Sequence, residues 1–353
     1  MDFSDIRAYP DKFFQTYWYK ILDDPHFKTL VNHLGSGQHL IKNKFIELKN
    51  LEQFKIVMIQ LVDLIVQKTT KGITFSGVEE LKTHKKQGSI FISNHRSTSL
   101  DPILFNYMLN KETGETAYNA AGDNLLNTSW LGHLIRLNRG FVVKRNVEDM
   151  DEKLLEANKL SLYIKSLIDK GKNVWIAQRN GRAKDGNDQT DSAVLAMLKL
   201  SHRDKSWDEL SHEIPIIPIS MSYEQIPLDT MIARDFLGMI DKSDNQRDSK
   251  QVFNEIGEQK RRIHIHVSPR IVGANRGDLV RSLDSNIIRG TRIWQSNTYA
   301  AELLKSIGLN KAKPVKWLKD KLMSQDLNIR NALLQLYAAP AINLKNLNNQ
   351  IGD

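Results

Sequence analysis

The chain has 353 residues, of which 41% are hydrophobic, 26% are charged and none is cysteine. This length and composition are typical of a globular protein with a sizeable core, and the lack of cysteine excludes disulfides, thiolate nucleophiles and cysteine-ligated metal sites. A net charge of +9 indicates an anionic partner, such as a membrane surface, a nucleic acid or an acidic carrier, without choosing among them.

Residues 1–71 are predicted to form a helical N-terminal region. The first residues, Met1 to Asp5, lack the basic start and apolar core of a secretory signal. The longest apolar stretch, residues 54–66, contains Lys55 and Asp63 and is shorter than the roughly 20 residues that a membrane span requires. We therefore expect a cytoplasmic protein without a transmembrane span. The stretch itself fits either a helix packed on the main domain or an amphipathic helix at a lipid surface.

Residues 72–275 alternate between short apolar strands and helices. Strands are predicted at 88–93, 116–121, 140–144, 173–177, 214–221 and 262–268, and helices at 103–110, 125–137, 150–170 and 190–202. This alternation predicts a three-layer αβα domain with a mostly parallel mixed sheet, preceded and followed by helical segments. The second helical segment, a C-terminal extension, spans 276–353, and its Asn-rich end is expected to fray.

The first candidate site follows the strand predicted at 88–93. Asn94 and His95 come directly after it, and Asp101-Pro102 opens the next helix. Histidine is the side chain best suited to accept a proton near neutral pH, and a carboxylate on its second ring nitrogen sets its tautomer and orientation. His95 and Asp101 therefore fit a general base for a hydroxyl. They also fit a plainer interpretation, a helix capped by Asp101 with proline in its first turn.

Basic residues follow two further predicted strands. Lys144 and Arg145 end the strand at 140–144. The loop after 173–177 adds five candidates: Arg179, Asn180, Gly181, Arg182 and Lys184. Arginine binds phosphate through two parallel hydrogen bonds, and glycine lets backbone amides approach an anion closely. These stretches fit either a phosphate site or solvated loops.

The strand predicted at 214–221 contains Pro215 and Pro218 among isoleucines. Because proline cannot donate a hydrogen bond to a sheet, this pattern is typical of the start of a strand or of an edge strand, and Ile217 and Pro218 are candidates for lining a pocket. His264 and His266 share one face of the strand predicted at 262–268, but no third ligand accompanies them, so we expect no metal site.

Taken together, these four stretches resemble the four ordered sequence blocks of the glycerol-phosphate and lysophosphatidic acid acyltransferase superfamily. The resemblance covers about residues 72–225, and plausibly extends to 270. Asn94-His95 with Asp101-Pro102 is similar to the block whose histidine is the general base and whose aspartate orients it. Residues 140–145 are similar to the second block, whose final arginine contacts the acceptor phosphate. The loop 180–186 looks like the third block, with Arg182 binding phosphate, and residues 214–219 look like the fourth, near the acyl chain.

Two departures from the family pattern affect the site. Five residues, not four, separate His95 from Asp101. A loop can bulge to absorb the extra residue, whereas in a helix it would turn Asp101 away by about 100°. Second, Arg179 stands where the family has a glutamate that helps to bind the acceptor.

The resemblance implies transfer of a fatty acyl group from acyl-CoA or acyl carrier protein to a hydroxyl of glycerol-3-phosphate or lysophosphatidic acid, as in phospholipid biosynthesis. His95 and Asp101 would be catalytic, and the acceptor phosphate would meet Lys144, Arg145, Arg182 and Lys184. The acyl chain would lie near Ile217 and Pro218. The resemblance implies no cofactor besides the acyl donor. The net charge also suits peripheral association with the anionic inner face of the membrane.

Three other functions remain open from the sequence. The first is a non-catalytic basic protein that binds membranes or phospholipids. The second is an acyl thioester hydrolase, in which water replaces the lipid hydroxyl. Nucleic-acid binding is prompted only by the charge, and because no nucleic-acid-binding motif accompanies it, we expect no nucleic-acid partner.

Overall fold

The computed structural model describes residues 2–33, 45–83, 87–126, 129–145, 147–240, 247–304 and 313–352. Its centre is a seven-stranded sheet in the order β1-β7-β6-β2-β5-β3-β4. The strands are β1 (Thr70–Ser76), β2 (Ile90–Ser93), β3 (Tyr118–Gly122), β4 (Gly140–Val143), β5 (Val174–Ala177), β6 (Ile216–Tyr223) and β7 (Arg261–Val267). Neighbouring strands run parallel, except that β6 and β7 are antiparallel.

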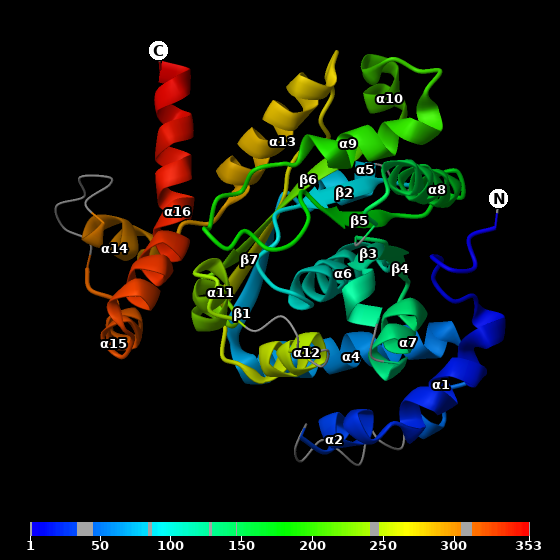
Figure 1. The fold of residues 1–353 in the computed structure, drawn as a ribbon, viewed down its shortest axis with the longest axis horizontal. Helices are drawn as coiled ribbons and strands as arrows, with labels where there is room; N and C mark the ends of the chain where they lie inside the picture. Colours follow the sequence, from blue (N-terminus) through cyan, green and yellow to red (C-terminus); the bar gives the residue numbers. More distant parts are fainter. Residues whose placement is uncertain are drawn as a thin grey trace.

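Helices surround this sheet and lead into and out of it (Figure 1). The described α-helices are α1 (Phe14–Asp23), α2 (Pro25–His33), α4 (Leu51–Thr69), α5 (Glu80–Thr83), α6 (Leu100–Thr113), α7 (Ser129–Leu137), α8 (Met150–Ile168), α9 (Ser192–Lys199), α10 (Trp207–Glu213), α11 (Asp229–Phe236), α12 (Arg247–Gly257), α13 (Arg276–Gly290), α14 (Gln295–Leu303), α15 (Lys316–Met323) and α16 (Leu327–Gly352). Short 3-10 helices are η1 (Asp11–Phe13), η3 (Asp123–Leu126) and η4 (Leu200–His202).

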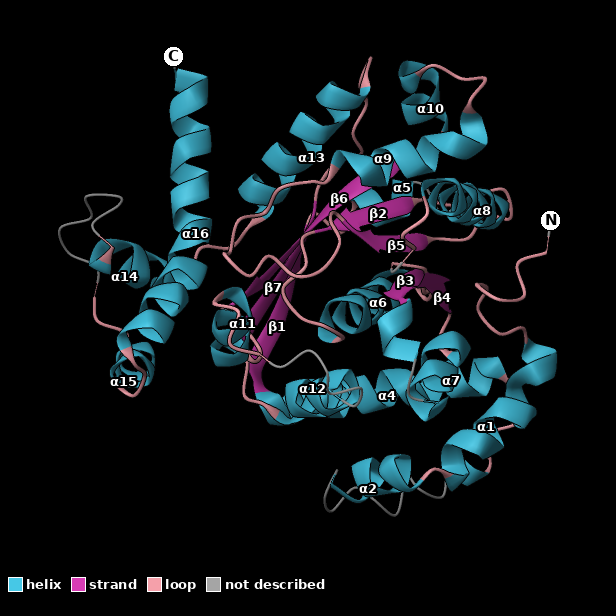
Figure 2. Cartoon of the chain, viewed as in Figure 1, coloured by secondary structure: helices cyan, strands magenta, loops and turns pink. Residues whose placement is uncertain are grey.

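The three layers follow from the alternation of side chains along the central strands. In β2, Ile90 and Ile92 face the cluster formed by α8, α9 and α13, whereas Phe91 faces the cluster that contains α6. Trp175 of β5 joins Phe91 on the α6 side. Figure 2 shows these two groups of helices on opposite sides of the strands. The αβα fold and the mostly parallel mixed sheet predicted from the sequence are therefore confirmed.

The N-terminal helices form a third hydrophobic cluster with α7. Phe14, Trp18 and Phe54 pack in it beside Trp130. Helix α4 takes part in two clusters, because Phe54 and Val57 lie in this one and Val62 and Val66 lie in the cluster around α6. Of the two interpretations of residues 54–66, the packed helix is the one observed. No helix in the described ranges has the length and hydrophobicity needed to cross a bilayer.

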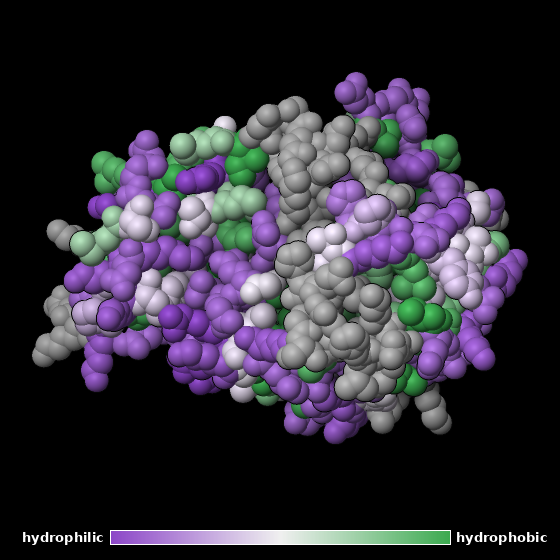
Figure 3. All heavy atoms as spheres, turned by 90° about the horizontal axis from the view of Figure 1, so that it is seen from below, coloured by the Kyte–Doolittle hydropathy of each residue, from purple (hydrophilic) through white to green (hydrophobic). Residues whose placement is uncertain are grey.

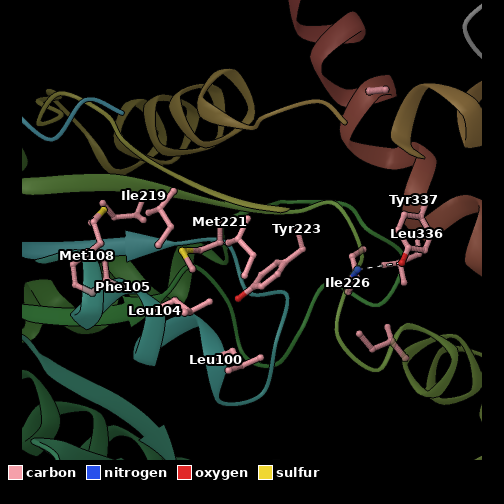
Figure 4. Packing of buried hydrophobic residues seen from close by; sticks show 14 of the residues in the cluster. Leu100, Leu104, Phe105, Met108, Ile219, Met221, Tyr223, Ile226, Leu336 and Tyr337 are labelled. Atoms are coloured by element: carbon pink, nitrogen blue, oxygen red, sulfur yellow. Dashed lines mark hydrogen bonds between the residues drawn. The ribbon is translucent and has the colours of Figure 1, made fainter. Parts of the chain in front are cut away.

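The C-terminal helices close the β6–β7 side of the molecule. Tyr337 of α16 donates its hydroxyl hydrogen to Asp229 of α11 (2.6 Å) and accepts the backbone N–H of Ile226 (3.1 Å; Figure 4). Helix α13 lies on the sheet, against β6, although the sequence division at residue 276 assigns it to the C-terminal extension. The expectation that the Asn-rich end frays is wrong, because α16 continues to Gly352. Each residue added to an existing helix gains one backbone hydrogen bond, and this favours continuation.

The structure corrects two details of the predicted sheet. Strand β1 was not predicted, because Thr70–Ser76 is only partly buried and lacks a continuous apolar run. Of the two positions that the prolines predicted, the start of a strand holds for Pro215, which directly precedes β6, whereas the edge does not hold, because β6 is an interior strand. The carbonyl of Pro218 accepts a hydrogen bond from Ser268, on the β7 side, and the paired residues of β6 and β7 begin only at Ile219. The missing N–H of Pro218 therefore falls just beyond that ladder, where it leaves no paired residue without a donor.

Candidate active site

His95 and Asp101 are joined by a hydrogen bond at the carboxyl end of β2. His95 Nδ1 lies 2.9 Å from Asp101 Oδ2, and the Asp101 side chain is fully buried. Helix α6 begins at Leu100, so the extra residue between the pair is accommodated in the preceding loop. Ser99, not Asp101, is the N-cap residue of α6. The plainer interpretation of Asp101 as a helix cap is therefore wrong.

The carboxylate of Asp101 is held by further donors. Its Oδ2 accepts the backbone N–H groups of Arg96 (2.7 Å) and Ser97 (2.9 Å), and its Oδ1 accepts the hydroxyl of Tyr223 (2.7 Å). Figure 4 shows Tyr223 reaching from β6 toward the start of α6. Burial, and then the nearby charge of Asp101, raise the pKa of Tyr223 well above its ordinary value. Tyr223 therefore remains a hydrogen-bond donor across the physiological pH range.

His95 lines a cavity, and the state of its second ring nitrogen follows from the bond between Nδ1 and Asp101. Because Nδ1 bonds to a carboxylate, it carries the proton, and Nε2 is left with the lone pair that accepts a proton. No hydrogen bond to Nε2 is found within the described residues. The imidazole is mostly buried, lines the cavity, and meets the ring of Trp175 edge-on with the centroids 6.3 Å apart. This arrangement suits removal of a proton from a group that enters the cavity.

A buried polar network fixes the loop that carries His95. The side-chain amide of Asn94 accepts the N–H of Met221 (2.7 Å) and donates to its carbonyl (3.2 Å), which joins the end of β2 to β6. Asn94 also donates to Asp188 Oδ2 (3.1 Å), which accepts from Arg96 Nη2 at 2.5 Å. Burial raises the pKa of Asp188, and Arg96 and then Asn94 oppose that rise. The backbone on both sides of His95 is thereby attached to β6 and to the loop after β5.

The cavity beside His95 has a volume of about 230 Å³. Its polar lining residues include His95, Thr98, Ser99 and Arg145. Its apolar wall comes mainly from the N-terminal helices and from α6 and α7: Trp18, Phe27, Met58, Ile59, Leu61, Val62, Ile65, Leu100, Ile103, Leu131, Leu134 and Ile135. The mixture provides a polar region next to the histidine and a long apolar surface for a nonpolar chain.

Arg145 reaches this cavity by passing over a glycine of β3. A Cβ on Gly122 would lie 2.4 Å from the Arg145 Nε, so any larger residue there would require the Arg145 side chain to move. Lys144 lies elsewhere: its ammonium pairs with Glu156 of α8 (2.7 Å) and with Asp5 (3.6 Å), and it does not line the cavity. Both cations follow the end of β4 at Val143, and their different partners separate them.

The loop after β5 lies over the His95 loop, since the N–H of Ala183 donates to the carbonyl of His95 (3.1 Å). Arg182 points to Glu255 of α12, with 3.8 Å between Nη1 and Oε1. Lys184 pairs instead with Asp235 of α11 (2.9 Å). Gly181 has a φ of 74°, a conformation that favours glycine. Arg179 is half-buried and Asn180 is exposed.

The two residues expected at the acyl chain lie inside the sheet instead. Ile217 is 1% exposed and packs in the core around α6, and Pro218 is buried on β6. Neither lines the cavity. The apolar wall comes instead from segments such as α1 and α4, which the sequence motifs do not include. The prediction misplaced the apolar surface because β6 is an interior strand whose side chains are covered on both faces.

Three residues of the site carried no assignment from the sequence. Tyr223 and Asn94 stand inside or beside the recognised stretches, where a polar group at a strand end is a usable signal. Glu255 is separated from Thr98 by 157 residues and belongs to a charged region without a motif. Only the folded chain brings it to the site. Within the described ranges, no cluster of three or more His, Cys, Asp or Glu side chains is arranged to hold a metal ion.

Comparison with known proteins finds one family. Residues 72–222 match the family model described as Acyltransferase. No curated protein matches the sequence significantly. Among solved structures, the crystal structure of the 1-acyl-sn-glycerophosphate (LPA) acyltransferase PlsC from Thermotoga maritima is similar with a TM-score of 0.41 and 14% identity, over 79% of this chain and 94% of that one. The segment that matches the family model, residues 72–222, contains His95, Asp101, Arg145 and Arg182.

Proposed function

Residues 72–222 belong to the acyltransferase family, and on this premise we propose that the protein transfers a fatty acyl group from acyl-CoA or acyl carrier protein to a hydroxyl of glycerol-3-phosphate or lysophosphatidic acid. The observation that carries the proposal is the His95–Asp101 pair, bonded at 2.9 Å, with His95 at the polar part of a mostly apolar cavity. Such a pair can activate a hydroxyl, and the cavity offers a place for the acyl chain.

In the proposed reaction, His95 Nε2 removes the proton of the acceptor hydroxyl while Asp101 stabilises the resulting imidazolium. The acceptor oxygen attacks the thioester carbon, and a carbon–oxygen bond forms. The carbon–sulfur bond then breaks, and the leaving thiolate takes the proton from the imidazolium. The enzyme returns to its starting state without a covalent acyl intermediate.

The acceptor phosphate is assigned to Arg145 and Arg182. Arg145 lines the cavity, and Arg182 lies on the loop that bonds to the backbone of His95 through Ala183. Lys184 lies on the same loop and adds positive charge, although its ammonium is engaged by Asp235. Lys144 has no part in binding the phosphate in this proposal, because its ammonium pairs with Glu156 away from the cavity. Holding the phosphate here would bring the hydroxyl to His95 in a reactive orientation.

We further propose that the protein works at the cytoplasmic surface of an anionic membrane. The net charge of +9 favours such a surface. Exposed apolar side chains occur on or near the N-terminal helices at Tyr19, Ile46 and Ile56. Figure 3 shows the face from below, where hydrophobic patches lie among hydrophilic residues. Tyr19 belongs to α1 and Ile56 to α4, and the same two helices contribute Trp18 and Met58 to the cavity wall, so a lipid would have a short path from the membrane to the site.

The test is His95→Ala with labelled acyl-CoA and lysophosphatidic acid or glycerol-3-phosphate as acceptor. We expect kcat to fall by about 10³-fold, because a positioned general base typically contributes about 10²- to 10⁴-fold. The matched control is His212→Ala, which removes an exposed histidine of α10 and is expected to leave the rate unchanged. Undiminished transfer by His95→Ala would contradict the mechanism.

The same assay separates the other functions. A membrane-binding protein without turnover would bind liposomes and form no product. A thioester hydrolase would release free fatty acid in the absence of acceptor.

A further inference from the structure

The loop that leads into α6 binds a carboxylate from a distant part of the chain. Glu255 of α12 accepts the backbone N–H of Thr98 (2.8 Å), the backbone N–H of Ser99 (3.0 Å) and the Ser99 hydroxyl (2.9 Å). Its side chain is fully buried. Backbone N–H groups at the start of a helix attract anions, since the helix dipole adds partial positive charge there. The loop is thus an anion site, and Glu255 occupies it.

Arg182 faces the same carboxylate without a hydrogen bond. Its Nη1 lies 3.8 Å from Glu255 Oε1, beyond hydrogen-bonding distance, and its side chain is only 10% exposed. Among the described residues, Nη1 has no hydrogen-bond partner. A buried guanidinium normally uses its donors, and a free one is costly. The unused donor points to a ligand that supplies more acceptor oxygens than one carboxylate.

The occupied site adjoins the candidate catalytic residues. Thr98 and Ser99 line the cavity together with His95, and so do Val252 and Ile256 on the same helix as Glu255. An acceptor with its hydroxyl at His95 and its anionic group at Arg182 must therefore meet Glu255. Two like charges within a few ångströms repel strongly where water is excluded.

We propose that Glu255 is a specificity-determining residue, whose carboxylate occupies the anion site formed by Thr98, Ser99 and Arg182 and must be displaced by the anionic group of the acceptor. The proposal rests on the proposed function, because it takes Arg182 as the acceptor's anchor. The charge of Glu255 lowers the affinity of the site for every anion. Only an acceptor that makes further contacts in the cavity therefore binds tightly enough to displace the carboxylate. Free phosphate lacks those contacts and is rejected.

Binding of inorganic phosphate tests the proposal without any turnover. Isothermal titration calorimetry at constant ionic strength would compare the wild type with Glu255→Gln. The glutamine side chain would present an amide N–H₂ to one of the loop donors, so it is held less firmly and lacks the charge. We expect phosphate to bind Glu255→Gln at least about tenfold more tightly than the wild type, since removal of a buried like charge is a large effect. In Glu255→Gln/Arg182→Gln the gain should disappear.

The matched control is Glu258→Gln, which removes a nearby carboxylate that accepts the N–H of Leu228 outside the site. It should leave phosphate affinity unchanged. Equal phosphate affinity in the wild type and Glu255→Gln, or a gain that persists in the double variant, would overturn the proposal. If Glu255→Gln fails to unfold cooperatively, Glu255→Ala replaces it with the same expected result.

A second measurement connects the anion site to acyl transfer. The ratio of kcat/KM for lysophosphatidic acid to that for monoacylglycerol, which lacks the phosphate, should rise about tenfold in Glu255→Gln. An unchanged ratio in an active enzyme would contradict the role of Glu255 in specificity. A protein that binds phosphate as expected but transfers no acyl group would contradict the proposed function and leave the anion site intact.

Discussion

At the scale of single residues, the site depends on how Asp101 is held. Backbone N–H groups and His95 occupy its Oδ2, and Tyr223 alone, within the described residues, donates to its Oδ1. A carboxylate held by several donors keeps one orientation, and its bond to the imidazole passes that orientation to the ring. Tyr223 therefore helps to set the orientation of Asp101 and, through it, that of His95.

Tyr223→Phe removes this donor and leaves the ring in place. Asp101 then has no donor on its Oδ1 within the described residues, so it holds the His95 ring less firmly in the orientation that accepts a proton. We expect kcat to fall about tenfold near neutral pH, in keeping with a hydrogen bond to a charged group worth about 1.5 to 3 kcal/mol.

Tyr163→Phe is the matched control, because its buried hydroxyl accepts the N–H of Ala8 far from the site. It should cost stability without lowering kcat. An unchanged kcat in Tyr223→Phe would show that the tyrosine only fills space.

At the scale of elements, α12 is attached to α4 and β1 through a buried lysine. The backbone N–H of Lys260 donates to the carbonyl of Thr69 (2.8 Å). Its ammonium donates to Thr69 Oγ1 (3.1 Å) and to the carbonyls of Ile256 (3.1 Å) and Glu258 (2.5 Å). Burial lowers the pKa of Lys260 to about 8, with Glu258 and Glu255 opposing the shift. The helix that carries Glu255 is thus fixed by a charge that is costly to bury.

This shift predicts how stability depends on pH. Because the folded-state pKa lies below the unfolded value of about 10.4, the native state binds fewer protons between about pH 8 and pH 10.4. Stability therefore rises with pH across this window, and the cost of the charged lysine is fully present below pH 8. The free energy of unfolding of Lys260→Met is subtracted from that of the wild type, which removes the pH dependence contributed by the other titratable groups. The difference should rise by about 3 kcal/mol between pH 7 and pH 10.4. A flat difference in urea titrations would contradict the prediction.

At the scale of the whole molecule, the cavity is shared between the N-terminal helices and the αβα domain. Trp18 of α1 forms part of its apolar wall and is held by a hydrogen bond from its indole N–H to the carbonyl of Phe45 (2.8 Å). His95 lies on the other contributor, the loop after β2. The two parts must dock for the cavity to exist, so the dimensions of the cavity are set by their packing.

Trp18→Leu should therefore change the preferred acyl length. Removing ring volume from the wall makes room for a longer chain, and each additional buried methylene contributes about 0.8 kcal/mol. The ratio of kcat/KM for a donor two carbons longer should rise about tenfold. Phe141→Leu, which empties space in the core near α8 and away from the cavity, should lower the melting temperature without changing that ratio. An unchanged preference in Trp18→Leu would place the acyl chain outside this cavity.

The sequence predicts correctly the features that depend on residues close to one another along the chain. Apolar runs with polar breaks predict six of the strands and the layer order, and the strand–loop–helix succession at residues 88–110 places His95 and Asp101 at one strand end. Arg182 follows β5 in the same way. These inferences succeed because the carboxyl ends of parallel strands meet at one edge of the sheet, whatever the details of packing.

Only the tertiary structure decided which side chains converge from distant segments. Lys144 and Arg145 are adjacent in sequence, yet one pairs with α8 and the other lines the cavity. The apolar wall lies on helices such as α1, α4 and α7, not on Ile217 and Pro218. Those two residues are covered because the whole of β6 is buried in the sheet. Glu255 reaches Thr98 across 157 residues. The local sequence pattern determines where catalytic residues can lie. Long-range packing determines which charges pair around them and the shape of the cavity that receives a ligand.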